Sequence, residues 1–290
     1  GLIYEEAMTV AVTNVNEAPV ISESDPQSVT MSEDGSPVAF SLTLHASDVD
    51  SGDVLTWSIS TAALHGTASA SGTGGTKVIG YIPNSGYAGT DSFVVRVTDS
   101  FGITDSLTVN VTITPVTRLD LVLGWNLVSI NVHPTNTDIA SVLDSIAGSY
   151  DLVYAWDAAS GLWVKYAPNV GYGNTLTTLD ETMGFWVRMT SLDTLVLSGT
   201  QPVATEIDLH TGWNLVGFPS GTSLPLPDAL SLHGAGTDFT LVYSYHAADV
   251  ADAWKRYDPA TGIGNDLTEM APGWGYWVRM SADHTWTVPY

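Results

Sequence analysis

The sequence predicts a mainly β fold: a β-sandwich followed by a duplicated β-rich domain with one short helix per repeat. Thr, Ser, Gly and Val dominate the composition, and the long Ala/Leu/Glu/Lys tracts of helical bundles are absent. One aromatic phrase also occurs twice. Residues 124–128 and 212–216 both read GWNLV, and residues 186–189 and 277–280 both read WVRM. Such a repeat indicates a duplicated structural unit.

The charge balance excludes some partners. The chain has 31 acidic and 8 basic residues, for a net charge of −23. Such a surface repels phosphate backbones and anionic membranes, so we expect no nucleic-acid partner and no membrane insertion. No apolar run approaches the roughly 18 residues of a membrane span. The chain lacks cysteine and opens at Gly1 without a Met, which favours a disulfide-free, processed or trimmed segment.

Residues 1–19 have the pattern of a terminal strand and linker from a preceding domain. Met8, Val10 and Val12 alternate with Thr and Ala, as in a half-buried strand. The same alternation occurs in residues 107–113. We therefore interpret residues 1–13 as the last strand of a domain whose other strands are missing.

Residues 20–116 have the length of one β-sandwich. Apolar stretches around Phe40, Trp57 and Phe93 are separated by turns rich in Gly, Asp, Asn and Pro. About seven short strands in about 100 residues is the size of an immunoglobulin-type sandwich.

Several motifs between residues 14 and 116 occur in the order of a known repeat. They are SEDG (32–35), ASDVDSGDVL (46–55), HGT (65–67), YIPN (81–84), YAGTDSF (87–93) and VTD (97–99). The segment resembles the bacterial cadherin-like, or tandem Ig-like, repeat of large surface and secreted proteins. This resemblance implies a non-catalytic spacer or adhesive unit that often binds calcium at domain junctions. The residues that carry over are Glu33, Asp48, Asp50 and Asp99, with Asn14, Asn16 and Glu17 from the linker.

The acidic turn at residues 48–53 is the sharpest candidate metal site. In an extended backbone Asp48 and Asp50 face the same side, and Gly52 allows a turn that returns Asp53 to them. Ca²⁺ takes six to eight oxygen ligands. We predict calcium binding here, and a higher melting temperature with calcium; the alternative is a solvated acidic turn. Asn14 stands where the linker would have an Asp, which would weaken a junctional site.

The two repeats occupy residues 117–202 and 203–290. Apolar residues at 139, 142, 143 and 146 predict a short helix with Asp138 as N-cap and Gly148 as C-cap. The counterpart at residues 227–232 is shorter, and the remainder predicts strands. The repeat loosely resembles a pattern in C-terminal regions of bacterial extracellular proteins, which implies no activity.

The repeated tryptophans have two interpretations. Trp186 and Arg188 share one strand face, and Trp277 and Arg279 repeat the arrangement. Because a duplicated fold rebuilds its core twice, we interpret the Trp residues of the GWNLV and WVRM motifs as core, each with an Arg beside a ring. An exposed Trp can instead stack on a sugar ring. The candidates for such carbohydrate platforms are the Trp residues without a twin, namely Trp156, Trp274 and Trp286.

Catalysis has little support in the sequence. Zinc-protease, nucleophile-elbow and phosphate-binding motifs are absent, and the seven histidines have no ligand spacing. We therefore expect no enzyme.

Two functions fit these features. The first is a calcium-stabilised, non-catalytic structural or adhesive protein of the bacterial cell surface, which assembles head to tail into filaments by adding the strand of Met8, Val10 and Val12 to a sheet edge of another copy. The alternative is a carbohydrate-binding accessory module of a larger secreted enzyme or adhesin. In a third and plainer case the strand packs on its own chain or on a crystal neighbour, which leaves a surface spacer.

Overall fold

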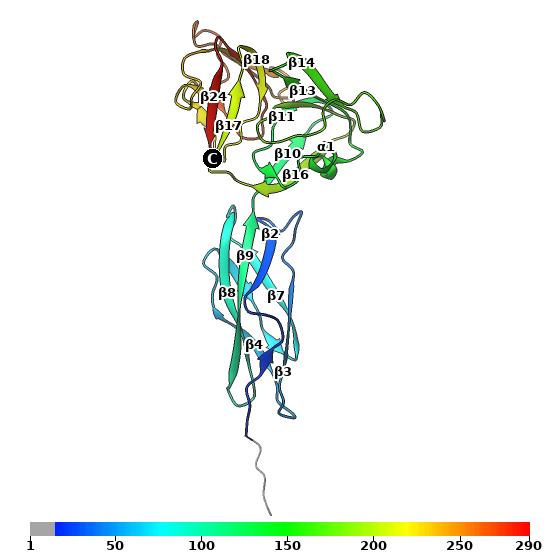
Figure 1. Cartoon of the computed structure of the whole chain (residues 1–290), viewed down its shortest axis with the longest axis vertical. Coiled ribbons are helices and arrows are strands. Elements are labelled where there is room, and N and C mark those ends of the chain that lie inside the picture. The colour runs from blue at the N-terminus through cyan, green and yellow to red at the C-terminus, as the bar shows by residue number, and fades with distance from the viewer. Residues whose placement is uncertain (1–14) are drawn as a thin grey trace, which may run out of the picture. The chain divides into compact units, whose positions relative to one another are not determined.

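The computed structural model describes residues 15–290. The predicted assembly strand (Met8, Val10 and Val12) and Asn14 lie outside the described residues. The chain divides into two compact units at Ile113 and Thr114, hereafter unit 1 and unit 2 (Figure 1). The mainly β prediction is confirmed, and no helix in the described part of the chain has the length and apolarity of a membrane span.

Unit 1 is a sandwich of two sheets. Its strands are Val20–Ile21 (β1), Gln27–Ser32 (β2), Leu42–Ser47 (β3), Thr56–Thr61 (β4), Gly66–Ser69 (β5), Gly72–Thr73 (β6), Thr76–Pro83 (β7), Gly89–Thr98 (β8) and Thr104–Thr114 (β9). One sheet has the order β1-β3-β7-β5 and the other β2-β9-β8-β4-β6. Leu44 and Ile79 from the first sheet and Val95 and Val109 from the second are fully buried in one core, because alternate residues of each strand face inward.

Asp91 is a buried carboxylate at the start of β8 in unit 1. It accepts hydrogen bonds from the backbone N–H groups of Leu64 (3.0 Å), His65 (2.8 Å) and Ser92 (2.8 Å), and from the Tyr81 hydroxyl (2.8 Å). The carboxylate therefore fastens the loop before β5 to both sheets.

Unit 2 contains the same four-stranded sheet twice, and the second half has one additional short strand, β22 (Glu269–Met270). The first half has β10 (Val116–Leu121), β11 (Gly124–Val128), β12 (His133–Pro134), α1 (Ile139–Val142), a 3₁₀ turn (Asp144–Ile146), β13 (Tyr150–Asp157), β14 (Leu162–Tyr166), β15 (Phe185–Met189) and β16 (Asp193–Thr200). The second has β17 (Ala204–Leu209), β18 (Gly212–Val216), β19 (Leu224–Pro225), α2 (Asp228–Ser231), β20 (Phe239–Tyr245), β21 (Trp254–Tyr257), β22 (Glu269–Met270), β23 (Tyr276–Met280) and β24 (His284–Pro289). The four-stranded sheets are β11-β15-β13-β14 and β18-β23-β20-β21.

Each half of unit 2 has its own core. Val153, Phe185 and Val187 are fully buried in the first half. Their counterparts in the second half are also buried. Both halves carry a register shift at the same place, between Tyr150 and Leu152 and between Phe239 and Leu241.

One short α-helix occurs in each half, as the sequence predicts. Asp138 caps the first, since its carboxylate accepts from the backbone N–H groups of Ala140 (3.0 Å) and Ser141 (3.2 Å). The predicted C-cap at Gly148 is wrong, because α1 ends at Val142 and a 3₁₀ turn follows.

The two halves of unit 2 interlock reciprocally. Met183 of the first half forms an isolated antiparallel β-bridge with Val216 of the second, and Trp274 of the second forms one with Val128 of the first. Ser129 supports the junction: its N–H donates to Gly273 O (3.1 Å) and its hydroxyl donates to Trp274 O (2.8 Å). The repeats thus pack as a two-fold-related pair, which places their aromatic strands side by side.

Candidate functional site

Three of the predicted metal ligands come together in unit 1. Asp48 follows β3, Asp53 precedes β4 and Asp99 follows β8, and their ligand atoms lie within 4.8 Å of one another. The adjacent ends of two strands and the turn between β3 and β4 place them there.

Three oxygens at this cluster lack a hydrogen-bond donor. They are the buried Oδ2 atoms of Asp48 and Asp53 and the buried Oδ1 atom of Asn16. Asn16 belongs to the cluster, because its Nδ2 donates to Asp99 Oδ2 (2.6 Å). Buried acceptors without a donor are costly, and a bound cation would satisfy them. The residues present therefore fit a divalent, oxygen-preferring metal.

The pKa values of Asp53 and Asp99 are shifted in opposite directions. Burial raises the pKa of Asp53, and the neighbouring charges of Asp48 and Asp99 raise it further, against a hydrogen bond to Ser100. Burial also acts to raise the pKa of Asp99, but the Asn16 amide and the backbone N–H groups that Asp99 accepts from lower it below its usual value. A cation beside Asp53 would favour its charged form, against the burial and the neighbouring carboxylates that raise its pKa.

The remaining predicted ligands lie elsewhere. Asp50 turns toward the linker, where its Oδ2 accepts from the Glu17 N–H (2.8 Å). The structure does not bring Glu33 to the cluster: Glu33 follows β2, in the turn closed by the Ser32 N–H to Val38 O bond. Sequence reasoning also missed Ser100, whose hydroxyl accepts from the Val54 N–H (2.9 Å) beside the cluster.

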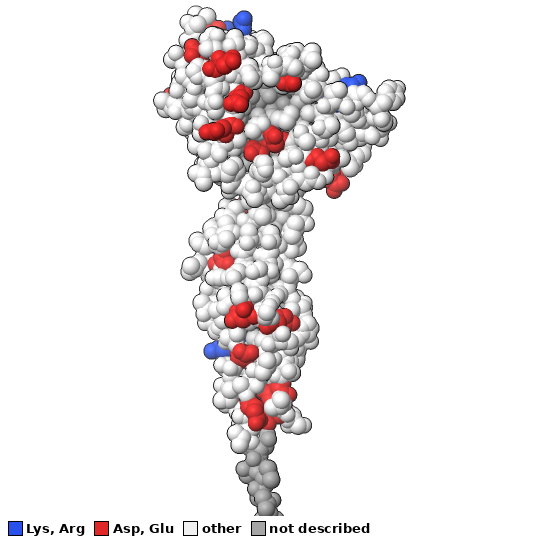
Figure 2. Space-filling model, viewed as in Figure 1, with Lys and Arg blue, Asp and Glu red and all other residues white. Residues whose placement is uncertain are grey.

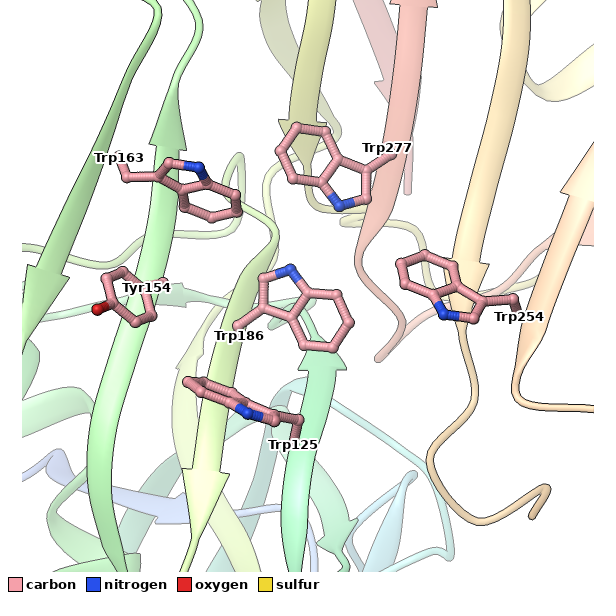
Figure 3. A pocket seen from close by; sticks show the side chains of 6 residues that line it. All are labelled: Trp125, Tyr154, Trp163, Trp186, Trp254 and Trp277. Carbon is pink, nitrogen blue, oxygen red and sulfur yellow. The ribbon is translucent and has the colours of Figure 1, made fainter.

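The aromatic residues of unit 2 line two adjoining pockets. The first, of about 620 Å³, is lined by six rings (Figure 3), namely Trp125, Tyr154, Trp163, Trp186, Trp254 and Trp277. The second, of about 500 Å³, is lined by Trp156, Trp163, Trp213, Tyr243, Trp254 and Trp277. We call the two together the aromatic groove. Both volumes lie in the range of small-ligand sites.

The ring contacts of the groove occur in matched pairs. Within the halves, Trp125–Trp186 (6.3 Å between centroids) corresponds to Trp213–Trp277 (6.1 Å), and both are edge-on. Across the halves, Trp186–Trp254 (5.8 Å) corresponds to Trp163–Trp277 (5.6 Å). Four equivalent rings from each half therefore line a groove between the halves, and Trp156 of the first half is the additional lining ring.

The interpretation of the repeated Trp residues as core is wrong. In β15, Phe185, Val187 and Met189 are buried and fill the core, while Trp186 on the opposite face lines the groove. Trp125, Trp213 and Trp277 lie in the groove likewise. The repeated Trp residues form the surface with which each repeat faces the other. Both repeats need this surface, so a duplication preserves it as it preserves a core.

The expected arginine contacts do occur. The Arg188 guanidinium lies 5.6 Å from the Trp125 ring centroid and pairs with Asp151 at 2.7 Å. The Arg279 guanidinium lies 6.0 Å from the Trp213 ring. Both cations stand at the edges of the groove, outside its lining.

The three candidate sugar platforms lie in different surroundings. Trp286 is fully buried, with its indole N–H donating to Ala229 O (2.9 Å), so it belongs to the core and that prediction is wrong. Trp274 is half-buried and stacks on His246 at 3.9 Å, outside the groove. Trp156 lines the second pocket and donates to Trp213 O (2.9 Å).

Sequence reasoning missed the most exposed rings of the groove. Trp163 and Trp254 are 49% and 48% exposed, and Tyr154 and Tyr243 stand beside them. The sequence contained an indication of these rings. Trp163 and Trp254 occupy equivalent positions of the two repeats, as do Tyr154 and Tyr243, and Tyr154 alternates with buried Val153 on β13.

The comparisons with known proteins concern unit 1. Residues 16–112 match a family model described as a bacterial Ig domain, which reaches no part of unit 2. A search of curated proteins finds no match to the chain. The two packed sheets around one core and the family match support an Ig-like repeat at residues 16–112.

Proposed function

We propose that this protein is a non-catalytic, secreted module of the bacterial cell surface, in which a calcium-stabilised Ig-like domain carries an adhesive unit. The aromatic groove carries the proposal. Half-exposed Trp163 and Trp254 line both of its pockets, and contiguous exposed apolar surface of this kind marks interaction sites. The family match supports it, because bacterial Ig-like domains are generally non-catalytic and often belong to surface proteins.

Adhesion is tested with beads coated with the full chain, on a panel of extracellular glycans and polypeptides. The double variant Trp163→Ala/Trp254→Ala is expected to lose retention on the polymer that the wild type binds. Its melting temperature should stay close to wild type, because both rings are half-exposed. The matched control Leu162→Ala/Leu232→Ala removes exposed apolar side chains outside the groove and should adhere normally. Equal retention of all three proteins would contradict the proposal.

For the cation we propose Ca²⁺ bound by Asp48, Asp53, Asp99 and Asn16. The support is the set of buried oxygens without donors, together with the clustered carboxylates. Calcium takes carboxylate and amide oxygens and would neutralise the repulsion among the three acids. It would join the linker residue Asn16 to the ends of β3 and β8, and so stiffen the beginning of the domain.

Calcium is expected to raise the melting temperature of unit 1 relative to chelator at matched ionic strength, because it binds the folded state alone. Asp53→Asn should abolish this shift. Glu33→Gln, which removes a carboxylate of the same domain outside the cluster, should retain it. A calcium shift that survives in Asp53→Asn would contradict the assignment of the ligands.

Filament assembly and carbohydrate binding stay predictions. The filament would form through residues 1–13, which the described structure does not include. Of the three predicted carbohydrate platforms, Trp156 in the groove and Trp274 outside it remain candidates.

A further inference from the structure

The two pockets of unit 2 are continuous, because Trp163, Trp254 and Trp277 line both. We propose that the aromatic groove binds an extended proline-rich polypeptide segment with basic flanks. The inference rests on the proposed adhesive function and names its ligand. Hydrogen-bonding chemistry, ring geometry and charge each support it.

The groove offers hydrogen-bond donors and almost no acceptors. Among the described tryptophans, the indole N–H groups of Trp57, Trp156 and Trp286 donate to backbone carbonyls. The other groove indoles donate to no acceptor among residues 15–290, and the N–H groups of Trp186 and Trp277 lie on ring edges that face each other (Figure 3). The lining contains no carboxylate, amide or cationic side chain.

This donor excess selects a ligand rich in acceptors and poor in donors. A proline segment has a carbonyl at every residue and no backbone N–H. A sugar chain brings many hydroxyls that donate as well as accept, and only the Tyr154 and Tyr243 hydroxyl oxygens of the lining side chains could accept from them. The balance therefore favours proline over carbohydrate.

The rings form slots and not a flat platform. Neighbouring indoles meet at 89° (Trp125 and Trp186), 75° (Trp163 and Trp277) and 73° (Trp156 and Trp163). A flat glycan ribbon needs rings in one plane. A compact pyrrolidine ring can pack into the corner that two steeply inclined indoles form, and a polyproline II segment is already extended before it binds, so it loses little entropy in aromatic-lined grooves.

The charge of the protein favours basic flanks on the ligand. The net charge is −23, and Figure 2 shows Asp and Glu side chains spread over the visible face with few Lys or Arg. Arg188 at the edge of the groove is paired with Asp151. Lysines on either side of the proline run would therefore meet an attractive field that speeds association.

The test is calorimetric titration of the full chain with a decaproline peptide that carries lysines at both ends. Trp163→Ala and Trp254→Ala are each expected to raise Kd by about tenfold or more, since each removes a ring that the bound peptide would cover. Because the two rings are twins, the losses should be similar. Trp254→Phe keeps a ring but removes the N–H donor, and should bind with intermediate affinity. Leu162→Ala should bind as the wild type does.

Two comparisons decide the ligand class. Added salt should weaken binding of the lysine-flanked peptide more than that of plain decaproline. A glycine-serine peptide with the same lysines should not bind. If a soluble or crystalline neutral glycan binds and decaproline does not, the inference is overturned while the adhesive function stands. If Trp254→Phe binds as tightly as wild type, the donor argument fails. Failure of the bead experiment would instead overturn the adhesive function itself.

Discussion

Asp91 shows how one acidic residue shapes unit 1. Four donors hold its carboxylate at the edge of the core. Burial acts to raise the pKa of Asp91, but the Tyr81 hydroxyl and the backbone N–H groups of Leu64 and His65 lower it below the usual value. The charged form is therefore stabilised in the folded state.

The lowered pKa fixes the direction of the pH dependence. Asp91 contributes stability above its unfolded pKa of about 4, and this contribution is lost as the pH falls through the lower folded value. Asp91→Ala should lower the free energy of unfolding by about 3 kcal/mol at neutral pH, because it leaves three backbone donors unpaired. Urea denaturation of unit 1 between pH 2 and pH 7 measures both effects.

The exposed acid Asp34 supplies the control for Asp91. Asp34 lies in a surface turn, and Asp34→Asn should lower the free energy of unfolding by less than about 1 kcal/mol. An Asp91→Ala protein as stable as wild type would show that the carboxylate does not fasten the loop.

At the level of elements, the junction of unit 2 depends on glycines that admit the partner backbone. A Cβ at Gly217 would come within 2.3 Å of Glu181 O, and one at Gly184 would come within 2.5 Å of Val216 O. Gly275 has the equivalent role in the second half, with Val128 O at 2.9 Å. Close approach of these strands is what brings the two aromatic sheets together.

Gly217→Ala is expected to destabilise unit 2 by about 2 kcal/mol or more, since backbone atoms would have to move apart. Thermal unfolding of unit 2 reports this loss, and proline-peptide affinity should fall with it. Gly171→Ala adds the same methyl group where nothing lies within 4 Å, and should be neutral. Similar melting temperatures for the two variants would contradict this role of the junction.

The sequence predicted the strand faces of unit 2 better than their surroundings. Alternation in β15 correctly separated Phe185 and Val187 from Trp186. It could not tell which face packs on the core of the same repeat and which faces the other repeat, because both faces are apolar. The same ambiguity hid the burial of Trp286, which depends on Ala229 of α2 and on Phe218, two residues beyond the end of β18.

For the whole molecule, the mainly β class followed from composition and turns, and the Ig-like domain from motifs in their order. Asp48, Asp53 and Asp99 were identifiable because a short turn and a family motif place them together. The aromatic groove was not, because its ring contacts join residues of different repeats, such as Trp163 with Trp277 and Trp186 with Trp254, and these contacts depend on the junction of the two repeats.

The reciprocal interlock also has a consequence for the biosynthesis of the protein. The first repeat can complete its own hydrophobic core as soon as residue 200 has emerged, but it then presents only its own rings of the aromatic groove. Translation must pass Trp277 before the opposite wall exists. A nascent or truncated chain would thus expose the indoles of the first repeat without the rings that face them, and the complete aromatic groove would form only with the last strands.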